Sequence, residues 1–111
     1  MPELKKYKMF IGGEWVDSDT KKTFETLNPE DNKPWAVVPE ASANDVDKAV
    51  KAAQKAFEGD WPKILPRERA KFLRAIGNKL RDNAELLGKI ETIDTGKLFR
   101  ETNKQANYIC L

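Results

Sequence analysis

The sequence predicts an α/β protein in which short strands come first and helices follow. Four short runs of apolar, aromatic and β-branched residues lie before residue 40. From residue 42 onward the apolar residues recur at spacings of three and four, which is the period of one helix face. With 111 residues, 40% of them hydrophobic, the chain is long enough for one small domain.

The strand signals of the first 40 residues are separated by turn residues. Two runs, MFI and EWV, flank the glycine pair at positions 12–13, and this arrangement is typical of a hairpin with a two-residue turn. A third run, TFETL at 23–27, is stopped by the Asn-Pro pair at 28–29. The fourth run, at 35–38, has a proline on either side, which predicts an edge strand or a short crossing segment.

A first helix is predicted to begin after Ser42 and to end at Gly59. The Ser42 hydroxyl can accept a hydrogen bond from the backbone N–H of Asp45, whose carboxylate suits the positive end of the helix dipole. One face of this helix is apolar and consists of Val46, Ala49, Val50, Ala53 and Phe57.

A second, longer helical stretch runs from Pro66 to Gly96. Proline suits the first turn of a helix, and Gly96 is the expected left-handed residue at its end. Asn83 can break or re-cap this helix. Its apolar positions form two sets: Ala70, Leu73, Ile76 and Leu80, then Leu86, Leu87, Ile90 and Ile93. We expect Leu73, Ile76 and Leu80 to pack against the first helix, because a short linker joins two apolar stripes of matching length.

A third helix is predicted to begin near Arg100. The chain stops soon afterwards, on apolar residues and without a capping signal. An uncapped apolar helix end is uncommon in a finished domain, so we expect the chain to be a piece of something larger.

The composition excludes several classes of function. The net charge is +2, and the 20 basic and 18 acidic residues are interleaved, so no one-signed stripe for a nucleic acid is present. No apolar run approaches the length of a membrane span, and the basic N-terminus lacks the apolar core of a secretory signal. With Cys110 as the one cysteine, no intrachain disulfide can form, so we expect a reducing compartment, the cytosol.

Few groups in the chain suit catalysis. There is no histidine, which removes the commonest general base and most zinc sites. Gly96 and Lys97 do not form a phosphate-binding loop, because Glu91 and Leu98 stand where that motif needs glycine and a hydroxyl residue. Nothing indicates a base near Cys110, which we interpret as an ordinary semi-buried thiol. We therefore predict no catalytic residue in this chain.

Asp94 is the carboxylate whose position needs an explanation. It lies near the C-terminal end of the long helix, where it faces the negative end of the dipole at a cost of about 0.3–1 kcal/mol. A lysine, loop N–H groups or a bound cation would offset this cost. Solvent or a neighbouring N–H is the simpler alternative.

Five blocks of the sequence follow one another over nearly the whole chain. They are MFIGGEWVDS, TFETLNP, VPEAS with DVDKAVKAAQKAF, RERAKFLRAIGNKL and ETIDTGKLFRET. In this order and spacing they resemble the N-terminal portion of the NAD(P)-dependent aldehyde dehydrogenase superfamily. The resemblance is closest to the betaine-aldehyde and general non-acylating branches. One departure is Leu65, where the family often has a Ser or Thr helix cap worth about 1 kcal/mol.

The resemblance implies a fold with an NAD-binding domain, a catalytic domain and a β oligomerisation arm. Residues 1–111 would be an incomplete N-terminal part of the NAD-binding domain. It would hold a β-rich entry segment at 1–40 and a helical segment at 41–111, namely two long packed helices and the start of a third, without the Rossmann-like sheet. The whole protein would be a homo-oligomer, a dimer or tetramer, in the cytosol.

The resemblance also implies an activity for the whole protein. It would oxidise an aldehyde to a carboxylic acid with NAD(P)+, through attack of a thiolate on the carbonyl, hydride transfer and hydrolysis of the thioester. The family's catalytic cysteine, glutamate and asparagine and its cofactor-binding turn match nothing in this chain. We therefore expect the chain alone to be inactive.

One site is implied within the chain. In many members of the family a monovalent cation, potassium or sodium, lies inside the subunit. Main-chain carbonyls just before an Asn-Pro pair hold it, with the aspartate of the ET-hydrophobic-D-(T/N)-G-K motif. The matching positions are Thr26, Leu27 and Asp94. Hard oxygen ligands of this kind suit an alkali or alkaline-earth cation.

A function of another class stays open, a small, self-contained helical module whose apolar faces bind a protein partner. Such a module should be monodisperse and melt cooperatively. Part of a dehydrogenase should instead aggregate or melt with poor cooperativity.

Overall fold

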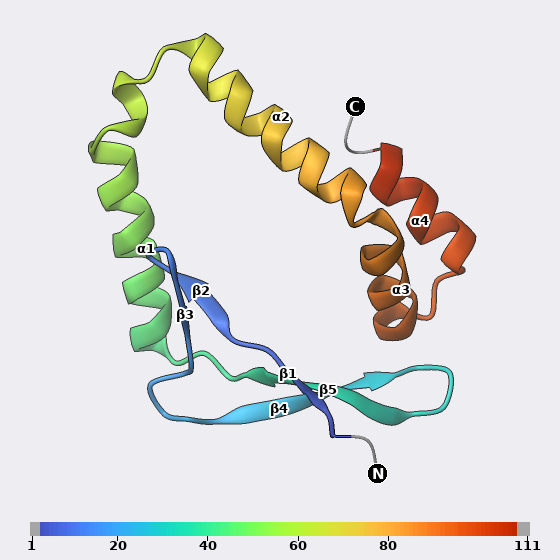
Figure 1. Cartoon of the computed structure of the whole chain (residues 1–111). Coiled ribbons are helices and arrows are strands. Elements are labelled where there is room, and N and C mark those ends of the chain that lie inside the picture. Colours follow the sequence, from blue (N-terminus) through green and yellow to red (C-terminus); the bar gives the residue numbers. More distant parts are fainter. Residues whose placement is uncertain (1–2, 109–111) are drawn as a thin grey trace. The chain divides into compact units, whose positions relative to one another are not determined.

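The computed structural model describes residues 3–108, which form five short strands and four α-helices (Figure 1). The strands are β1 (Lys5–Lys6), β2 (Met9–Ile11), β3 (Glu14–Val16), β4 (Thr23–Asn28) and β5 (Lys33–Pro39). The helices are α1 (Ala43–Glu58), α2 (Pro66–Asp82), α3 (Ala84–Thr95) and α4 (Phe99–Tyr108), with a 3₁₀ turn, η1 (Trp61–Lys63), after α1. The α/β class and the order of strands before helices are confirmed. Cys110 lies outside the described residues.

The chain divides into two compact units. The first comprises the residues up to Leu27 together with Pro34–Lys63. The second comprises Asn28–Lys33 and the chain from Ile64 onward. The first unit therefore holds most of the strands and α1, and the second holds the β4–β5 turn with α2, α3 and α4.

The β2–β3 hairpin confirms the turn predicted at the glycine pair. Phe10 pairs with Trp15 across the two antiparallel strands, and the centres of their rings lie 4.9 Å apart. Gly12 and Gly13 have φ angles of 62° and 88°. A left-handed backbone at both turn positions matches the twist of the flanking strands, and glycine adopts it without strain.

β5 is the central strand of a second sheet with the order β1–β5–β4. β1 runs parallel to it, with Lys5 opposite Ala36 and Lys6 opposite Val37. The prediction of an edge strand or crossing segment at residues 35–38 is therefore wrong. The two prolines lie near the ends of β5, so the residues between them keep their N–H groups for both neighbouring strands. Ala36 is fully buried in this sheet.

α1 begins and ends where the sequence predicted. The Ser42 hydroxyl accepts from the N–H of Asp45 at 3.1 Å, and the Ser42 N–H donates to the Asp45 carboxylate at 3.0 Å. Gly59 follows the last helical residue. The apolar face of α1 is exposed, and Phe57 on this face is 67% exposed to solvent.

The stretch predicted as one long helix forms two helices, α2 and α3, with Asn83 between them. The Asn83 N–H is shared between the carbonyls of Lys79 and Leu80, both at 3.2 Å, and its side-chain amide donates to Lys79 at 2.8 Å. These bonds tighten the last turn of α2 and end its hydrogen-bond ladder. The expected two long helices and start of a third are thus corrected to four helices within residues 3–108.

α3 and α4 pack closely where Gly88 meets Asn103. A Cβ on Gly88 would lie 2.9 Å from the Cα of Asn103, so glycine allows the two backbones to approach. The hydroxyl of Thr102, a fully buried residue, donates to the Gly88 carbonyl at 2.9 Å and lies 3.0 Å from the Thr92 hydroxyl. This junction joins α3 to α4 within the second unit.

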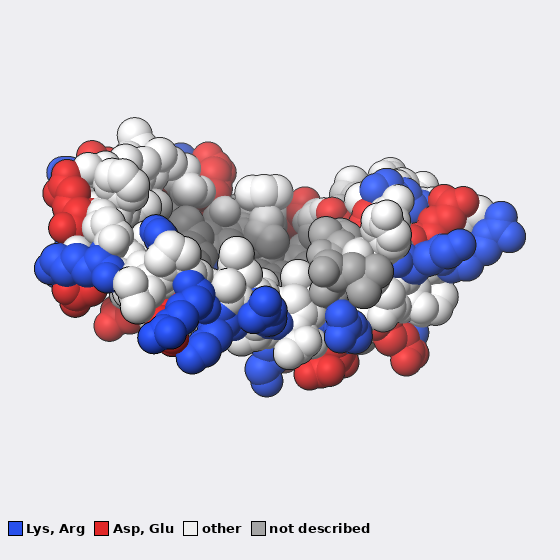
Figure 2. Space-filling model, turned by 90° about the horizontal axis from the view of Figure 1, so that it is seen from above, with Lys and Arg blue, Asp and Glu red and all other residues white. Residues whose placement is uncertain are grey.

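Little apolar surface is buried within the described residues. The buried apolar residues there are Ala36 in the first unit and Ala84 in the second. On α2, Leu73 is 67% and Ile76 56% exposed. Figure 2 shows acidic and basic side chains lying among uncharged ones on the face in view. Between residues 3 and 108, no helix combines the length and the apolar character needed to span a bilayer.

Candidate functional site

Asp94 lies in the last turn of α3, next to the residue that ends the helix. Gly96 has a φ of 75°, and its N–H donates to the Thr92 carbonyl at 2.9 Å, which confirms the predicted left-handed end. The last turn of α3 contains no basic residue, and Asp94 is exposed. Lys97, which follows, pairs with Glu91 at 2.7 Å.

A cavity of about 550 Å³ lies beside this end of α3, within the second unit. Asn28, Pro29 and Glu30 form part of its lining, and Thr92, Ile93 and residues 96–99 form the rest, so Asp94 is beside the cavity lining but not part of it. A Cβ on Gly96 would lie 3.0 Å from the Cγ of Pro29. The turn after β4 therefore lies directly against the end of α3.

The three residues predicted to hold a cation belong to both units. Thr26, which is half-buried, and Leu27, which is 44% exposed, are residues of β4 in the first unit, whereas Asp94 belongs to the second. Within residues 3–108, no three His, Cys, Asp or Glu side chains gather as metal ligands. The predicted site consists mainly of main-chain carbonyls, so the absence of such a side-chain group from these residues does not test it. The cation site stays a prediction.

Asp45 is the centre of a polar cluster that joins the start of α1 to the loop after β3. Asp45 is only 3% exposed. Its carboxylate accepts a hydrogen bond from the Ser18 hydroxyl at 3.0 Å and another from the Asp19 N–H at 3.2 Å. The pKa of Asp45 is lowered, and the hydrogen bond from the Ser42 N–H contributes most. Burial raises the pKa, but the Asp19 N–H and the hydroxyls of Ser18 and Ser42 lower it further. A carboxylate held ionised by several donors is a poor general base, so this cluster is structural.

Sequence reasoning found only half of this cluster. The pairing of Ser42 with Asp45 follows from a capping pattern within three residues. Ser18 and Asp19 lie 27 and 26 residues from Asp45, and no local pattern connects them to it.

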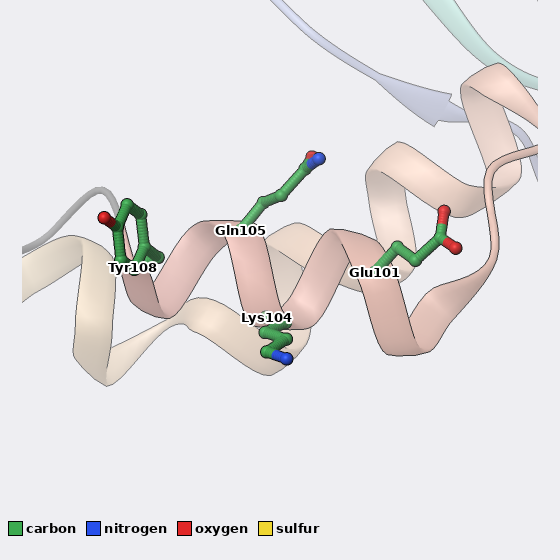
Figure 3. Close-up of a pocket in the computed structure, with 4 residues that line it drawn as sticks. All are labelled: Glu101, Lys104, Gln105 and Tyr108. Atoms are coloured by element: carbon green, nitrogen blue, oxygen red, sulfur yellow. The ribbon is translucent and has the colours of Figure 1, made fainter.

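Another cavity, of about 500 Å³, lies along α4 and is lined by Glu101, Lys104, Gln105 and Tyr108. Figure 3 shows that Lys104 and Gln105 leave the helix in opposite directions. Catalysis requires polar groups that converge on one point, so this cavity does not have the arrangement of an active site.

Comparison with known proteins identifies the family. A model of the aldehyde dehydrogenase family matches residues 15–110. The aldehyde dehydrogenase family 2 member C4 of Arabidopsis thaliana is 41% identical over 101 residues, which is 90% of this chain and 20% of that protein. The chain spans about a fifth of the length of such curated relatives.

Solved structures agree with the sequence match. An NAD-dependent aldehyde dehydrogenase from Sinorhizobium meliloti has a TM-score of 0.93 and 30% identity, over 97% of this chain and 22% of that one. The betaine aldehyde dehydrogenase of Staphylococcus aureus, solved in complex with NAD+, has a TM-score of 0.89 and 36% identity, over 93% of this chain and 21% of that one. The chain belongs to the aldehyde dehydrogenase family.

Proposed function

We propose that the whole protein containing this chain oxidises an aldehyde to a carboxylic acid with NAD(P)+. The observation that carries this proposal is the family match over residues 15–110. The chain would open the NAD-binding domain, with its β-rich segment at 1–40 and its helical segment at 41–111. A homo-oligomer, dimer or tetramer, and a cytosolic location belong to the same proposal.

The glycines of the described residues do not fit a cradle for NAD(P). The pair at 12–13 turns a hairpin, and Gly59, Gly77, Gly88 and Gly96 lie within helices or at their ends. The pyrophosphate of a dinucleotide instead needs glycines between a strand and the start of a helix. When bound, NAD(P)+ accepts the hydride. The role of this chain would be to support the domain that binds it.

A hybrid enzyme tests the proposal. In it, this chain replaces the matching N-terminal fifth of the Staphylococcus aureus betaine aldehyde dehydrogenase. We expect the hybrid to reduce NAD+ with betaine aldehyde, whereas that enzyme without its N-terminal fifth should not. The 111-residue chain alone should produce no NADH above a blank without protein. A folded hybrid that binds NAD+ but leaves the aldehyde unchanged would contradict the proposal.

The alternative, a self-contained interaction module, makes a different prediction. Such a module needs its own apolar core, yet the described residues bury little beyond Ala36 and Ala84. We expect the purified chain to associate or to melt without a sharp transition. A monodisperse chain with a cooperative melt would favour the module.

We further propose that Thr26, Leu27 and Asp94 hold a monovalent cation in the whole protein. Support comes from the donor set, two main-chain carbonyls and a carboxylate, and from the turn at Asn28 and Pro29 lying against the end of α3. The cation would offset the unfavourable position of Asp94 on the helix dipole.

Melting curves of the hybrid enzyme in potassium and in a bulky organic cation test this site. We expect potassium to raise the melting temperature, Asp94→Asn to reduce the gain, and Asp94→Ala to reduce it more. Asp82→Asn, a carboxylate at the end of α2, is the control. Equal melting temperatures in both salts would refute the cation.

A further inference from the structure

A cavity of about 370 Å³ in the first unit has a basic lining. Lys6, Lys21 and Lys22 line it, with Asp17 as the acidic group. The three lysines come from β1 and from the loop between β3 and β4. The Lys22 ammonium forms no ion pair with any carboxylate of the described residues.

The acidic groups nearby neutralise little of this charge. Asp17 is shared by Lys21 at 3.9 Å and Lys8 at 3.8 Å, so one carboxylate faces two ammonium groups. Glu3 pairs with Lys6 at 3.7 Å, but both side chains are more than 70% exposed. Exposed pairs at these distances are weak and easily exchanged for a better partner.

Tyr7, between β1 and β2, also lines this cavity and carries an unsatisfied polar atom. Its hydroxyl oxygen is buried and has no hydrogen-bond partner among the described residues. The ring is fixed edge-on against Trp35, with 6.2 Å between ring centres. Buried hydroxyls are nearly always paired, so an orphan beside a cavity indicates a missing acceptor or donor.

The backbone of the loop is strained at one of the cavity lysines. Lys21 has a φ of 58°, and its N–H closes a turn by donating to the Ser18 carbonyl at 2.9 Å. A long side chain seldom occupies this left-handed region, and such outliers concentrate at ligand sites.

We propose that this cavity binds a phosphate-type dianion, either inorganic phosphate or a phosphate monoester. Three ammonium groups and one carboxylate leave two positive charges in the lining, which a dianion balances and chloride does not. Lysine binds phosphate as a point charge, and the Tyr7 phenol supplies a neutral hydrogen-bonding group beside it. The proposal concerns the first unit alone and does not depend on aldehyde oxidation.

Calorimetric titration of the hybrid enzyme, with its NAD+ site saturated and at constant ionic strength, tests the phosphate site. The titrants are inorganic phosphate and methyl phosphate in chloride buffer. We expect saturable binding of one phosphate per chain. Lys22→Gln should weaken it about tenfold, the effect of losing one charged contact. Lys51→Gln, an exposed lysine of α1 in the same unit, should leave the affinity unchanged.

Tyr7→Phe provides a second variant that does not threaten the fold. Because its hydroxyl has no partner in the described residues, its removal should leave the far-UV circular dichroism, which reports the backbone, unchanged while weakening phosphate binding. Tighter binding of methyl phosphate would identify a monoester as the ligand, and equal binding would identify free phosphate as sufficient. Equal affinities of the wild type and Lys22→Gln, or binding of RNA or anionic vesicles without binding of phosphate, would overturn the proposal.

Discussion

At the scale of single residues, Asp45 ties the loop after β3 to the first turn of α1. Its pKa is lowered in the folded chain, so its contribution to stability is present above its unfolded pKa and is lost as the pH falls through the folded value. In the hybrid enzyme we expect urea denaturation to show the wild-type sequence losing stability below about pH 4. Asp45→Asn should be less stable at neutral pH and change less on acidification. The exposed Asp47→Asn, which disturbs only an ion pair with Lys51, should follow the wild type.

Gly88 is the residue on which the junction of α3 and α4 depends. In Gly88→Ala the new Cβ would overlap the backbone of Asn103, which must move. We expect a loss of about 1–3 kcal/mol, typical of overpacking, despite the better helix propensity of alanine. Hydrogen exchange of the α4 amides measures this loss of stability. Lys89→Ala, at the exposed neighbouring position, should change their protection by less than about 0.5 kcal/mol. Unchanged protection in Gly88→Ala would show that the helices can separate freely.

At the scale of elements, α2 begins without a side-chain cap. Leu65 occupies the N-cap position with an extended backbone, at φ −60° and ψ 145°, and makes no capping hydrogen bond. Leu65→Ser should stabilise α2 by about 1 kcal/mol relative to Leu65→Ala, because its hydroxyl can accept from an unpaired N–H of the first turn. Far-UV circular dichroism during thermal unfolding measures the difference. If Leu65→Ser were no more stable than Leu65→Ala, Pro66 alone would fix the start of α2.

Elements whose ends depend on local chemistry were predictable from the sequence. The glycine pair at 12–13, the capping box at Ser42 and the left-handed Gly96 each act within a few residues, and the structure has all three as expected. β1 was missed, because two lysines carry no strand signal and their pairing with β5 spans 31 residues. The central position of β5 depends on that pairing, so it could not be predicted either.

The candidate site was predictable to a smaller extent. The location of Asp94 at a helix end follows from the pattern that ends at Gly96. That Pro29 lies against Gly96 depends on tertiary packing, and no local pattern in the sequence indicates it. The basic cavity at Tyr7 had no sequence signal, since its lysines come from separate segments.

At the scale of the whole molecule, the described residues include more exposed large apolar side chains than buried apolar ones. Val46, Val50 and Phe57 on α1 are 55%, 61% and 67% exposed. An apolar helix face of this extent is usually covered in a finished fold. The chain spans only about a fifth of its relatives, so we expect the rest of that fold to provide the cover.

Phe57 distinguishes the isolated chain from the complete fold. In the chain, Phe57→Ala removes a side chain that is largely in water, so the loss of stability should be below about 0.5 kcal/mol. In the hybrid enzyme the same face should be buried, partly against Leu73, Ile76 and Leu80 of α2 as the sequence predicts, and the loss should reach about 3–5 kcal/mol. Urea denaturation of the hybrid measures the larger loss, and hydrogen exchange of the α1 amides in the isolated chain measures the smaller one. Lys55→Ala, an exposed residue in the last turn of α1, should have a small effect in both. A loss well under 1 kcal/mol for Phe57→Ala in an active hybrid would show that this face stays open to solvent in the complete enzyme.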